Sequence, residues 1–212
     1  MQPEKSYHIY THANGFENLF LSDENYRYFL QRYEYFIPSI ADTLAYCLMP
    51  NHIHFLVSIK SEKLLLELYR NKYPEKEIPA TLRGFKTLEE FIIRQFSHLF
   101  NSYTQAFNKM YKRRGSLFIH SFKRKEIESD QQLTNTIHYI HVNPVHHGFV
   151  KNISDWPWSS YQILLNDNPT MLKREEILAW FGNRVEFERF HQQVINIKSI
   201  QPNVGFEHSM DL

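Results

Sequence analysis

Two histidines at alternate positions could bind a metal ion. His52 and His54 flank a single isoleucine, Ile53. In a β-strand, residues two apart point to the same face, so both imidazoles would lie side by side. Two neighbouring imidazoles form half of a divalent-metal site, which needs a third ligand from elsewhere in the fold. A bare pair of this kind is more often two surface histidines on an edge strand, so the spacing alone leaves both interpretations open.

A tyrosine and an asparagine further along the chain could act on a phosphate. Tyr139 and Asn143 are four residues apart, so on a helix they share one face. A phenol with its ordinary pKa of about 10 is a poor nucleophile. A nearby divalent ion and a polarised phosphate would allow phosphoryl transfer to it, which gives a phosphotyrosine ester. The plain alternative is a tyrosine at the edge of the core, followed by a helix-stopping Asn-Pro. We expect four nearby histidines to be phosphate contacts or ordinary surface residues: His138, His141, His146 and His147.

The first half of the chain contains the elements that would position the histidine pair. Residues 6–11 have the aromatic and β-branched content of a strand. Residues 22–37 have apolar side chains at helical spacing, and Pro38 ends the pattern. Residues 43–49 and 52–59 are two apolar runs around a Pro-Asn turn, which predicts an antiparallel hairpin. The histidine pair would begin its second strand.

The second half is predicted to be mostly helical. The longest helical pattern covers residues 88–112, and residues 116–127 are typical of strand and loop. A helix over 130–142 would end at Asn143-Pro144. Two further helices are predicted over 173–180 and 184–195.

The order of elements predicts the fold class α+β. We expect an antiparallel sheet with helices on one face and a helical C-terminal extension. The expected domain covers residues 1–165, with an insertion around 60–86, and the extension covers residues 166–212.

Composition limits the classes of function. The net charge is +1, so the chain is no polycation, and nucleic-acid binding would need a local basic patch. The only cysteine, Cys47, excludes an intramolecular disulfide. No apolar run approaches the roughly 18 residues of a membrane span, and the first residues do not resemble a signal peptide. We expect a cytoplasmic protein without a membrane partner.

Two basic clusters could supply the local patch. They flank one predicted strand and could hold a phosphate backbone with salt-sensitive affinity. On charge alone, a solvated helix end and a polar loop are an equal alternative. The residues are Lys112, Arg113, Arg114, Lys123, Arg124 and Lys125.

Several blocks in the right order resemble one known family. The segment 49–57, MPNHIHFLV, looks like the HUH motif of single-tyrosine transposases. The segment 139–145, YIHVNPV, is similar to a block of their REP-associated branch, and 155–161, DWPWSSY, matches the block that follows it there. Each block is moderately specific, and their combination over residues 5–165 is much more so.

This resemblance implies a fold, a reaction and a set of site residues. The fold would be ferredoxin-like, with the histidines on a central strand. His52 and His54 would bind Mg²⁺ or Mn²⁺, Asn143 would be a third polar ligand, and Tyr139 would be the nucleophile. The family cuts single-stranded DNA, typically at hairpin-forming repeats, through a 5′-phosphotyrosine link. Many relatives are dimers, so a homodimer that binds hairpin DNA is expected, in a bacterial cytoplasm and on the nucleoid when DNA is bound.

Two other functions remain open from the sequence. One is a retired transposase that only binds hairpin DNA, for example as a regulator. The other is a small hydrolase that uses the histidines and a metal-bound water, which would not need Tyr139. The family commonly has an arginine soon after its first strand, and His12 stands near that position here.

Overall fold

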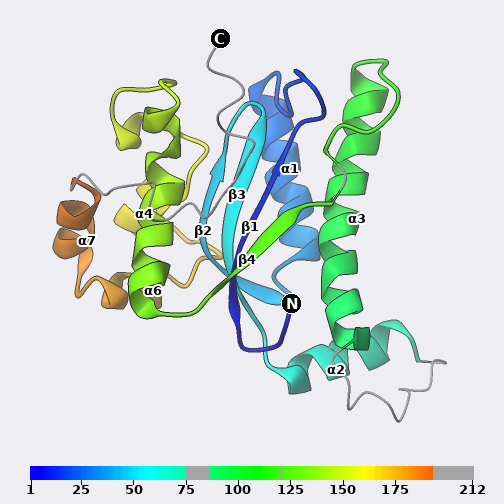
Figure 1. Cartoon of the computed structure of the whole chain (residues 1–212), viewed down its shortest axis with the longest axis horizontal. Helices are drawn as coiled ribbons and strands as arrows, with labels where there is room; N and C mark the ends of the chain where they lie inside the picture. The colour runs from blue at the N-terminus through cyan, green and yellow to red at the C-terminus, as the bar shows by residue number, and fades with distance from the viewer. Residues whose placement is uncertain (75–85, 120, 193–212) are drawn as a thin grey trace.

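A four-stranded antiparallel sheet forms the centre of the molecule (Figure 1). The computed structural model describes residues 1–74, 86–119 and 121–192. The strands stand in the order β2-β3-β1-β4, and each neighbouring pair is antiparallel. Their bounds are β1 Ser6–His12, β2 Ala41–Leu48, β3 His52–Ile59 and β4 Lys123–Ile127. The predicted hairpin around Pro50-Asn51 is confirmed as β2 and β3.

Two long helices cover one face of this sheet. They are α1, Asp23–Phe36, and α3, Lys86–Met110. The ring of Phe55 in β3 stacks on Tyr33 of α1, with 4.4 Å between the centroids. With α1 between β1 and β2, and α3 between β3 and β4, the chain has the β-α-β-β-α-β order of a ferredoxin-like fold. The α+β class and the antiparallel sheet are therefore as predicted.

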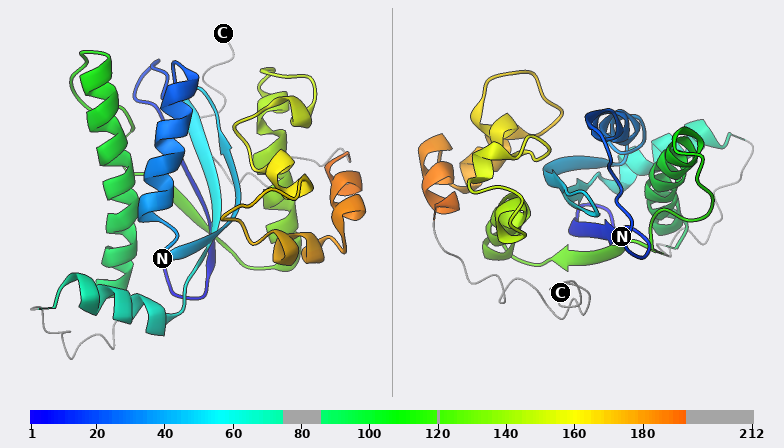
Figure 2. Two further views of the ribbon diagram at one scale, coloured as in Figure 1. Left: turned by 180° about the vertical axis from the view of Figure 1, so that it is seen from behind. Right: turned by 90° about the horizontal axis from the view of Figure 1, so that it is seen from above.

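The opposite face of the sheet carries a third helix, α4, Asp130–His146, which packs on β2 and β3 (Figure 2). The expectation of helices on one face thus holds for α1 and α3 but not for α4. The physical reason is the burial of β3, where seven of eight residues are buried and side chains alternate between both faces. A strand of this kind needs cover on both sides.

The register of β1 and β3 gathers histidines on the α4 side. Side chains directly opposite each other on antiparallel strands share a face. His12 stands opposite His52, and Tyr10 stands opposite His54. Ile9 and Phe55, which are also paired, point the other way, into the core below α1 and α3.

Helix α4 does not end where the Asn-Pro pair predicted. It continues through Pro144 to His146. A proline within a helix lacks one N–H donor and is costly in the interior, but here it lies in the last turn. The end is closed by the backbone N–H of His147, which donates to the Asn143 carbonyl over 3.0 Å, and by Gly148 with its φ of +70°.

Short helices complete the described chain. Within the predicted insertion lies α2, Glu62–Lys72, while residues 75–85 are outside the described part. After α4 come a 3-10 turn at Ile153–Asp155, α5 at Tyr161–Leu165, α6 at Arg174–Trp180 and α7 at Arg184–His191. The predicted helix over 184–195 is confirmed up to His191, and residues from 193 onward lie outside the described chain. In the part described, no helix is both long and apolar enough to span a bilayer.

Candidate functional site

The four residues proposed from the two motifs meet between β3 and α4. His52 and His54 point from β3 towards α4, and Asn143 Oδ1 lies 2.9 Å from His52 Nε2. The ring of Tyr139 lies edge-on to that of His54, with 5.4 Å between the centroids. All four are buried, with 2% of His52, 1% of His54, 3% of Tyr139 and 0% of Asn143 exposed. The spacing of two on a strand and of four on a helix directs them to one place.

Strand β1 adds two histidines that the motifs did not predict as part of the site. His8 Nε2 lies 3.0 Å from His54 Nδ1, and its ring centroid is 5.8 Å from that of Tyr139. The ring of His12 stacks on His52 at 4.8 Å. The alternation of residues 6–12 places both histidines on one face of the strand. The sequence therefore held a signal, but the pairing of β1 with β3 was needed to interpret it.

Burial keeps His8, His52 and His54 in the neutral form. It lowers the pKa of His52 to about 3 and that of His8 to about 3, and it holds the pKa of His54 well below the ordinary value. Neighbouring imidazoles add to the effect at His52 and His54. A neutral imidazole has a free lone pair, which is the form that binds a metal ion.

An amide side chain, that of Asn143, lies beside the histidine pair. In residues 1–74, 86–119 and 121–192, no group of three or more histidine, cysteine, aspartate or glutamate side chains is arranged to hold a metal ion. A metal ion held by His52 and His54 would therefore need a third ligand of another type, and the Asn143 amide oxygen is a polar group beside the pair. The second nitrogen of His52, Nδ1, lies 2.8 Å from Asn51 Oδ1.

The other histidines of α4 divide into two kinds. His146 and His147 are exposed, as expected, and the ring of His147 lies 5.0 Å from that of His52. His138 and His141 are buried, so the expectation of surface residues is wrong for both. His141 follows Tyr139 by two residues, about 200° around the helix, and so faces away from the site.

His141 connects α4 to the C-terminal helices. Its Nδ1 lies 2.9 Å from Nε2 of His191 on α7, and its Nε2 lies 2.7 Å from Ser160 Oγ. The His191 Nδ1–H donates to the Phe187 carbonyl over 2.8 Å. The Ser160 hydroxyl in turn accepts a hydrogen bond from the backbone N–H of Tyr46 in β2. This buried chain of hydrogen bonds joins α7, α4 and the sheet.

The predicted basic residues do not form one surface. On β4, Lys125 stands opposite His8 and Lys123 opposite Tyr10, so both lysines share the face of the site. Arg124 lies between them and points to the other face, where it forms an ion pair with Glu89 at 3.2 Å.

The first basic cluster is also divided. The Arg113 guanidinium binds the Glu17 carboxylate, Asn108 Oδ1 and the backbone carbonyl of Ser116. Lys112 and Arg114 form no ion pair with any other residue of the described chain. Arg113 therefore stabilises its own loop, while its two neighbours keep their charges available.

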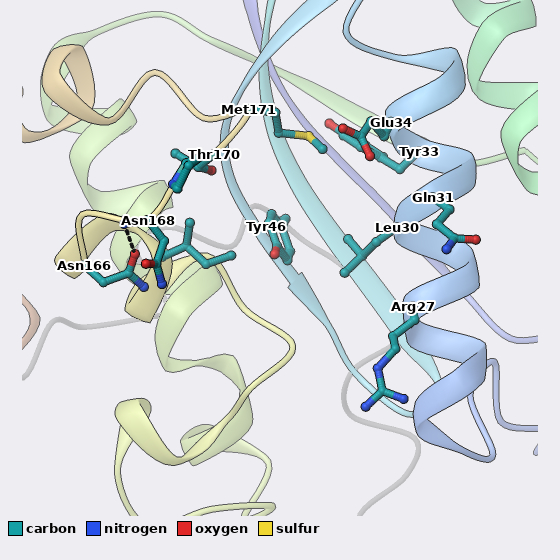
Figure 3. A pocket seen from close by; sticks show the side chains of 12 residues that line it. Arg27, Leu30, Gln31, Tyr33, Glu34, Tyr46, Asn166, Asn168, Thr170 and Met171 are labelled. Atoms are coloured by element: carbon teal, nitrogen blue, oxygen red, sulfur yellow. Dashed lines mark hydrogen bonds between the residues drawn. The ribbon is translucent and has the colours of Figure 1, made fainter.

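A cavity of about 750 Å³ lies elsewhere, beside α1 (Figure 3). Arg27, Leu30 and Gln31 line it from α1, while Asn168 and Met171 face them from the segment after α5. None of the proposed site residues lines it, so it is separate from the histidine cluster.

The structure brings the His-x-His pair of a ferredoxin-like sheet next to the tyrosine of a helix, and these are two of the motifs that resemble the HUH single-tyrosine transposases. No protein-family model matches the chain. Two curated proteins match it. A Haemophilus influenzae protein named as a REP-associated tyrosine transposase is 29% identical over 122 residues, which cover 57% of this chain and 58% of that protein. The REP-associated tyrosine transposase of Escherichia coli is 40% identical over 40 residues, 19% of this chain and 24% of that protein.

The chain is thus similar to proteins named REP-associated tyrosine transposases, the branch that its motifs resemble. The matches span less than two thirds of the length of either relative. A solved structure of a REP-associated tyrosine transposase bound to a REP hairpin matches with a TM-score of 0.53 and 14% identity. That match covers 76% of this chain and 79% of the other, and it confirms the fold.

Proposed function

We propose that this protein is a metal-dependent, single-stranded DNA endonuclease and strand transferase that acts on hairpin-forming repeat DNA through a 5′-phosphotyrosine intermediate. The observation that supports this most is the meeting of Tyr139 with the buried pair His52 and His54 and with Asn143. Each motif alone has an ordinary structural explanation. Because a strand and a helix bring all four side chains to one place, we infer that these residues act in one reaction.

The residues present fit a divalent cation. His54 Nε2 is buried and has no hydrogen-bond partner among the described residues, and burial of an unsatisfied polar atom is costly. When His52 Nδ1–H donates to Asn51 Oδ1, the His52 Nε2 lone pair faces Asn143 Oδ1 across 2.9 Å. Two acceptors that face each other at this distance are stabilised by a cation.

The donor set favours one of the two expected metals. Two imidazole nitrogens and one amide oxygen suit Mn²⁺ better than Mg²⁺, which prefers oxygen ligands. His52, His54 and Asn143 would hold the ion. When bound, it would polarise the scissile phosphate and neutralise developing negative charge.

Tyr139 would carry out the covalent step. Its hydroxyl oxygen attacks the phosphorus and loses its proton, and the bond between phosphorus and the 3′ oxygen breaks. The 3′ oxygen gains a proton and leaves as a hydroxyl, while the 5′ phosphate remains on the tyrosine. The ester conserves the energy of the broken bond, so a second 3′ hydroxyl can reverse the step and join the strands. The helix would align the phenol for in-line attack.

Lysines on the site face would guide the DNA backbone. Lys123 and Lys125 project from β4 on the same side as His8, and Lys125 depresses the pKa of His8 by its charge, after the larger effect of burial. We propose that these two lysines, with Lys112 and Arg114, bind phosphates. Arg113 and Arg124 are engaged in ion pairs, so we expect smaller contributions from them.

A covalent-trapping experiment tests the proposal. The protein is incubated with labelled single-stranded hairpin DNA and Mn²⁺, and the products are separated under denaturing conditions. We expect a protein–DNA adduct that Tyr139→Phe abolishes. Tyr35→Phe is the matched control, because that tyrosine is 72% exposed on α1.

Two results would contradict the proposal in different ways. Cleavage that persists in Tyr139→Phe would favour a hydrolase that uses a metal-bound water. Binding without any adduct, over varied repeat sequences, would favour a regulator that only recognises hairpins. The expected homodimer is tested separately by light scattering on the purified protein, with and without hairpin DNA.

A further inference from the structure

The two ring nitrogens of His54 have different surroundings. Nδ1 lies 3.0 Å from His8 Nε2 on the neighbouring strand. Nε2 is buried and has no hydrogen-bond partner within the described chain. One side of the ring is therefore held by another residue, and the other side is left for a ligand.

Only one of the two facing nitrogens can carry a proton. If His8 Nε2–H donates to His54 Nδ1, the remaining proton of the neutral His54 ring sits on Nε2. A buried N–H without an acceptor is destabilising, and a nitrogen that carries a proton cannot bind a metal ion. If His54 Nδ1–H donates to His8 Nε2, the lone pair of His54 Nε2 is free. Only this second arrangement makes His54 a metal ligand.

We propose that His8 is a positioning residue that accepts a hydrogen bond from His54 Nδ1–H and thereby presents the Nε2 lone pair of His54 to a divalent cation. This inference rests on the metal site of the proposed function. Outer hydrogen bonds of this kind commonly fix the tautomer and ring orientation of histidine ligands. His8 itself would not contact the ion or the DNA.

The fold holds His8 in the required position. His8 stands opposite Leu56 in the β1–β3 register, so it is a diagonal neighbour of His54, two residues away. Its ring stacks on His54 with 5.1 Å between the centroids and lies edge-on to Tyr139 at 5.8 Å. One side chain of β1 therefore touches both a proposed ligand and the proposed nucleophile.

The other histidine of the pair has the same arrangement. His52 Nδ1 lies 2.8 Å from Asn51 Oδ1, and its Nε2 faces Asn143. Both histidines thus have Nδ1 held by a neighbouring residue and Nε2 directed into the site. A repeated orientation of this kind is expected of two ligands that share one ion.

Metal affinity, measured without DNA, tests the role of His8. Mn²⁺ binding is followed by titration calorimetry for the wild type, His8→Phe, His8→Gln and His98→Phe. We expect His8→Phe to weaken Mn²⁺ binding by roughly 10- to 100-fold, the usual effect of losing an outer partner. The amide oxygen of His8→Gln can accept the same hydrogen bond, so it should restore most of the affinity. His98 lies on α3, away from the site, and its replacement should change nothing.

The tautomer of His54 gives a second measurement, which needs no variant. Long-range ¹⁵N–¹H spectra of the metal-free wild type should show His54 protonated at Nδ1. A proton on Nε2 would overturn the inference, as would wild-type Mn²⁺ affinity in His8→Phe. In both cases an adduct at Tyr139 would leave the proposed function standing. A wild type that forms the adduct without binding any Mn²⁺ would refute the metal site and the role of His8 together.

Discussion

At the scale of single residues, local motifs predicted which residues meet at the centre of the candidate site, but not which residues surround them. His52, His54, Tyr139 and Asn143 could be chosen from the sequence because each pair has a spacing that its own strand or helix brings to one face. His8 could not be chosen from the sequence in this way. Its contact with His54 depends on the register between β1 and β3, which are separated by 39 residues of the chain. Residue types show which chemistry is available, whereas pairing between distant segments decides which residues meet.

Buried neutral histidines predict a loss of stability in acid. Burial lowers the pKa of His191 from 6.5 to about 3 in the folded protein. Between these values the unfolded chain binds more protons, so stability is full above about pH 6.5 and falls as the pH drops towards 3. For His191 alone we expect a loss of roughly 2 kcal/mol between about pH 7.5 and about pH 5.

Thermal unfolding of the metal-free protein measures this effect. His191→Gln keeps hydrogen-bonding groups but does not titrate, so its melting temperature should fall less between the two pH values. His146→Gln is the control, because His146 is exposed at the end of α4. A wild type and a His191→Gln variant with equal acid sensitivity would show that His191 does not contribute.

At the scale of elements, α4 has two functional sides. Tyr139 and Asn143 face the sheet, and His141 faces Ser160 and α7. The apolar pattern predicted most of this helix, but its end was misplaced because a proline in the last turn removes only one hydrogen bond. The burial of His138 and His141 could not be predicted, since it depends on where α7 packs.

Replacing His141 should loosen the contact between α4 and α7. His141→Phe leaves His191 Nε2 without its partner in a buried region and removes one of the hydrogen bonds of the Ser160 hydroxyl, which keeps those to the Tyr46 backbone. We expect the free energy of unfolding to fall by about 2–4 kcal/mol, measured by urea denaturation. His146→Phe makes the same change at an exposed position and should cost less than about 0.5 kcal/mol. Equal stability of the two variants would mean that the hydrogen-bonded chain has no net effect.

At the scale of the whole molecule, the positions of the basic residues matter more for DNA binding than the net charge of the chain does. The chain carries only +1, yet Lys123 and Lys125 stand on the site face while Arg124 points away. The antiparallel sheet was predictable from the order of elements. The helices on both of its faces were not predicted, because the order of elements does not show on which face α4 packs.

This placement predicts the salt dependence of DNA binding. Affinity for single-stranded hairpin DNA is measured by fluorescence anisotropy over a series of salt concentrations. Loss of two phosphate contacts in Lys123→Ala/Lys125→Ala should reduce the slope of log affinity against log salt by roughly 1.4–1.8. Arg124→Ala, the control from the same strand, should change the slope by less than about half of that. A larger effect from Arg124 than from the two lysines would contradict the assignment of the faces.

The identity of the linked residue tests the central claim most directly. Trypsin cleaves after Lys125 and Lys151, and the peptide 126–151 contains a single tyrosine, Tyr139. After reaction with hairpin DNA and Mn²⁺, nuclease treatment leaves a nucleotide on the linked residue, and mass spectrometry locates it. We expect the added mass on peptide 126–151, with fragmentation that assigns it to Tyr139. A nucleotide found on any other peptide would contradict Tyr139 as the nucleophile.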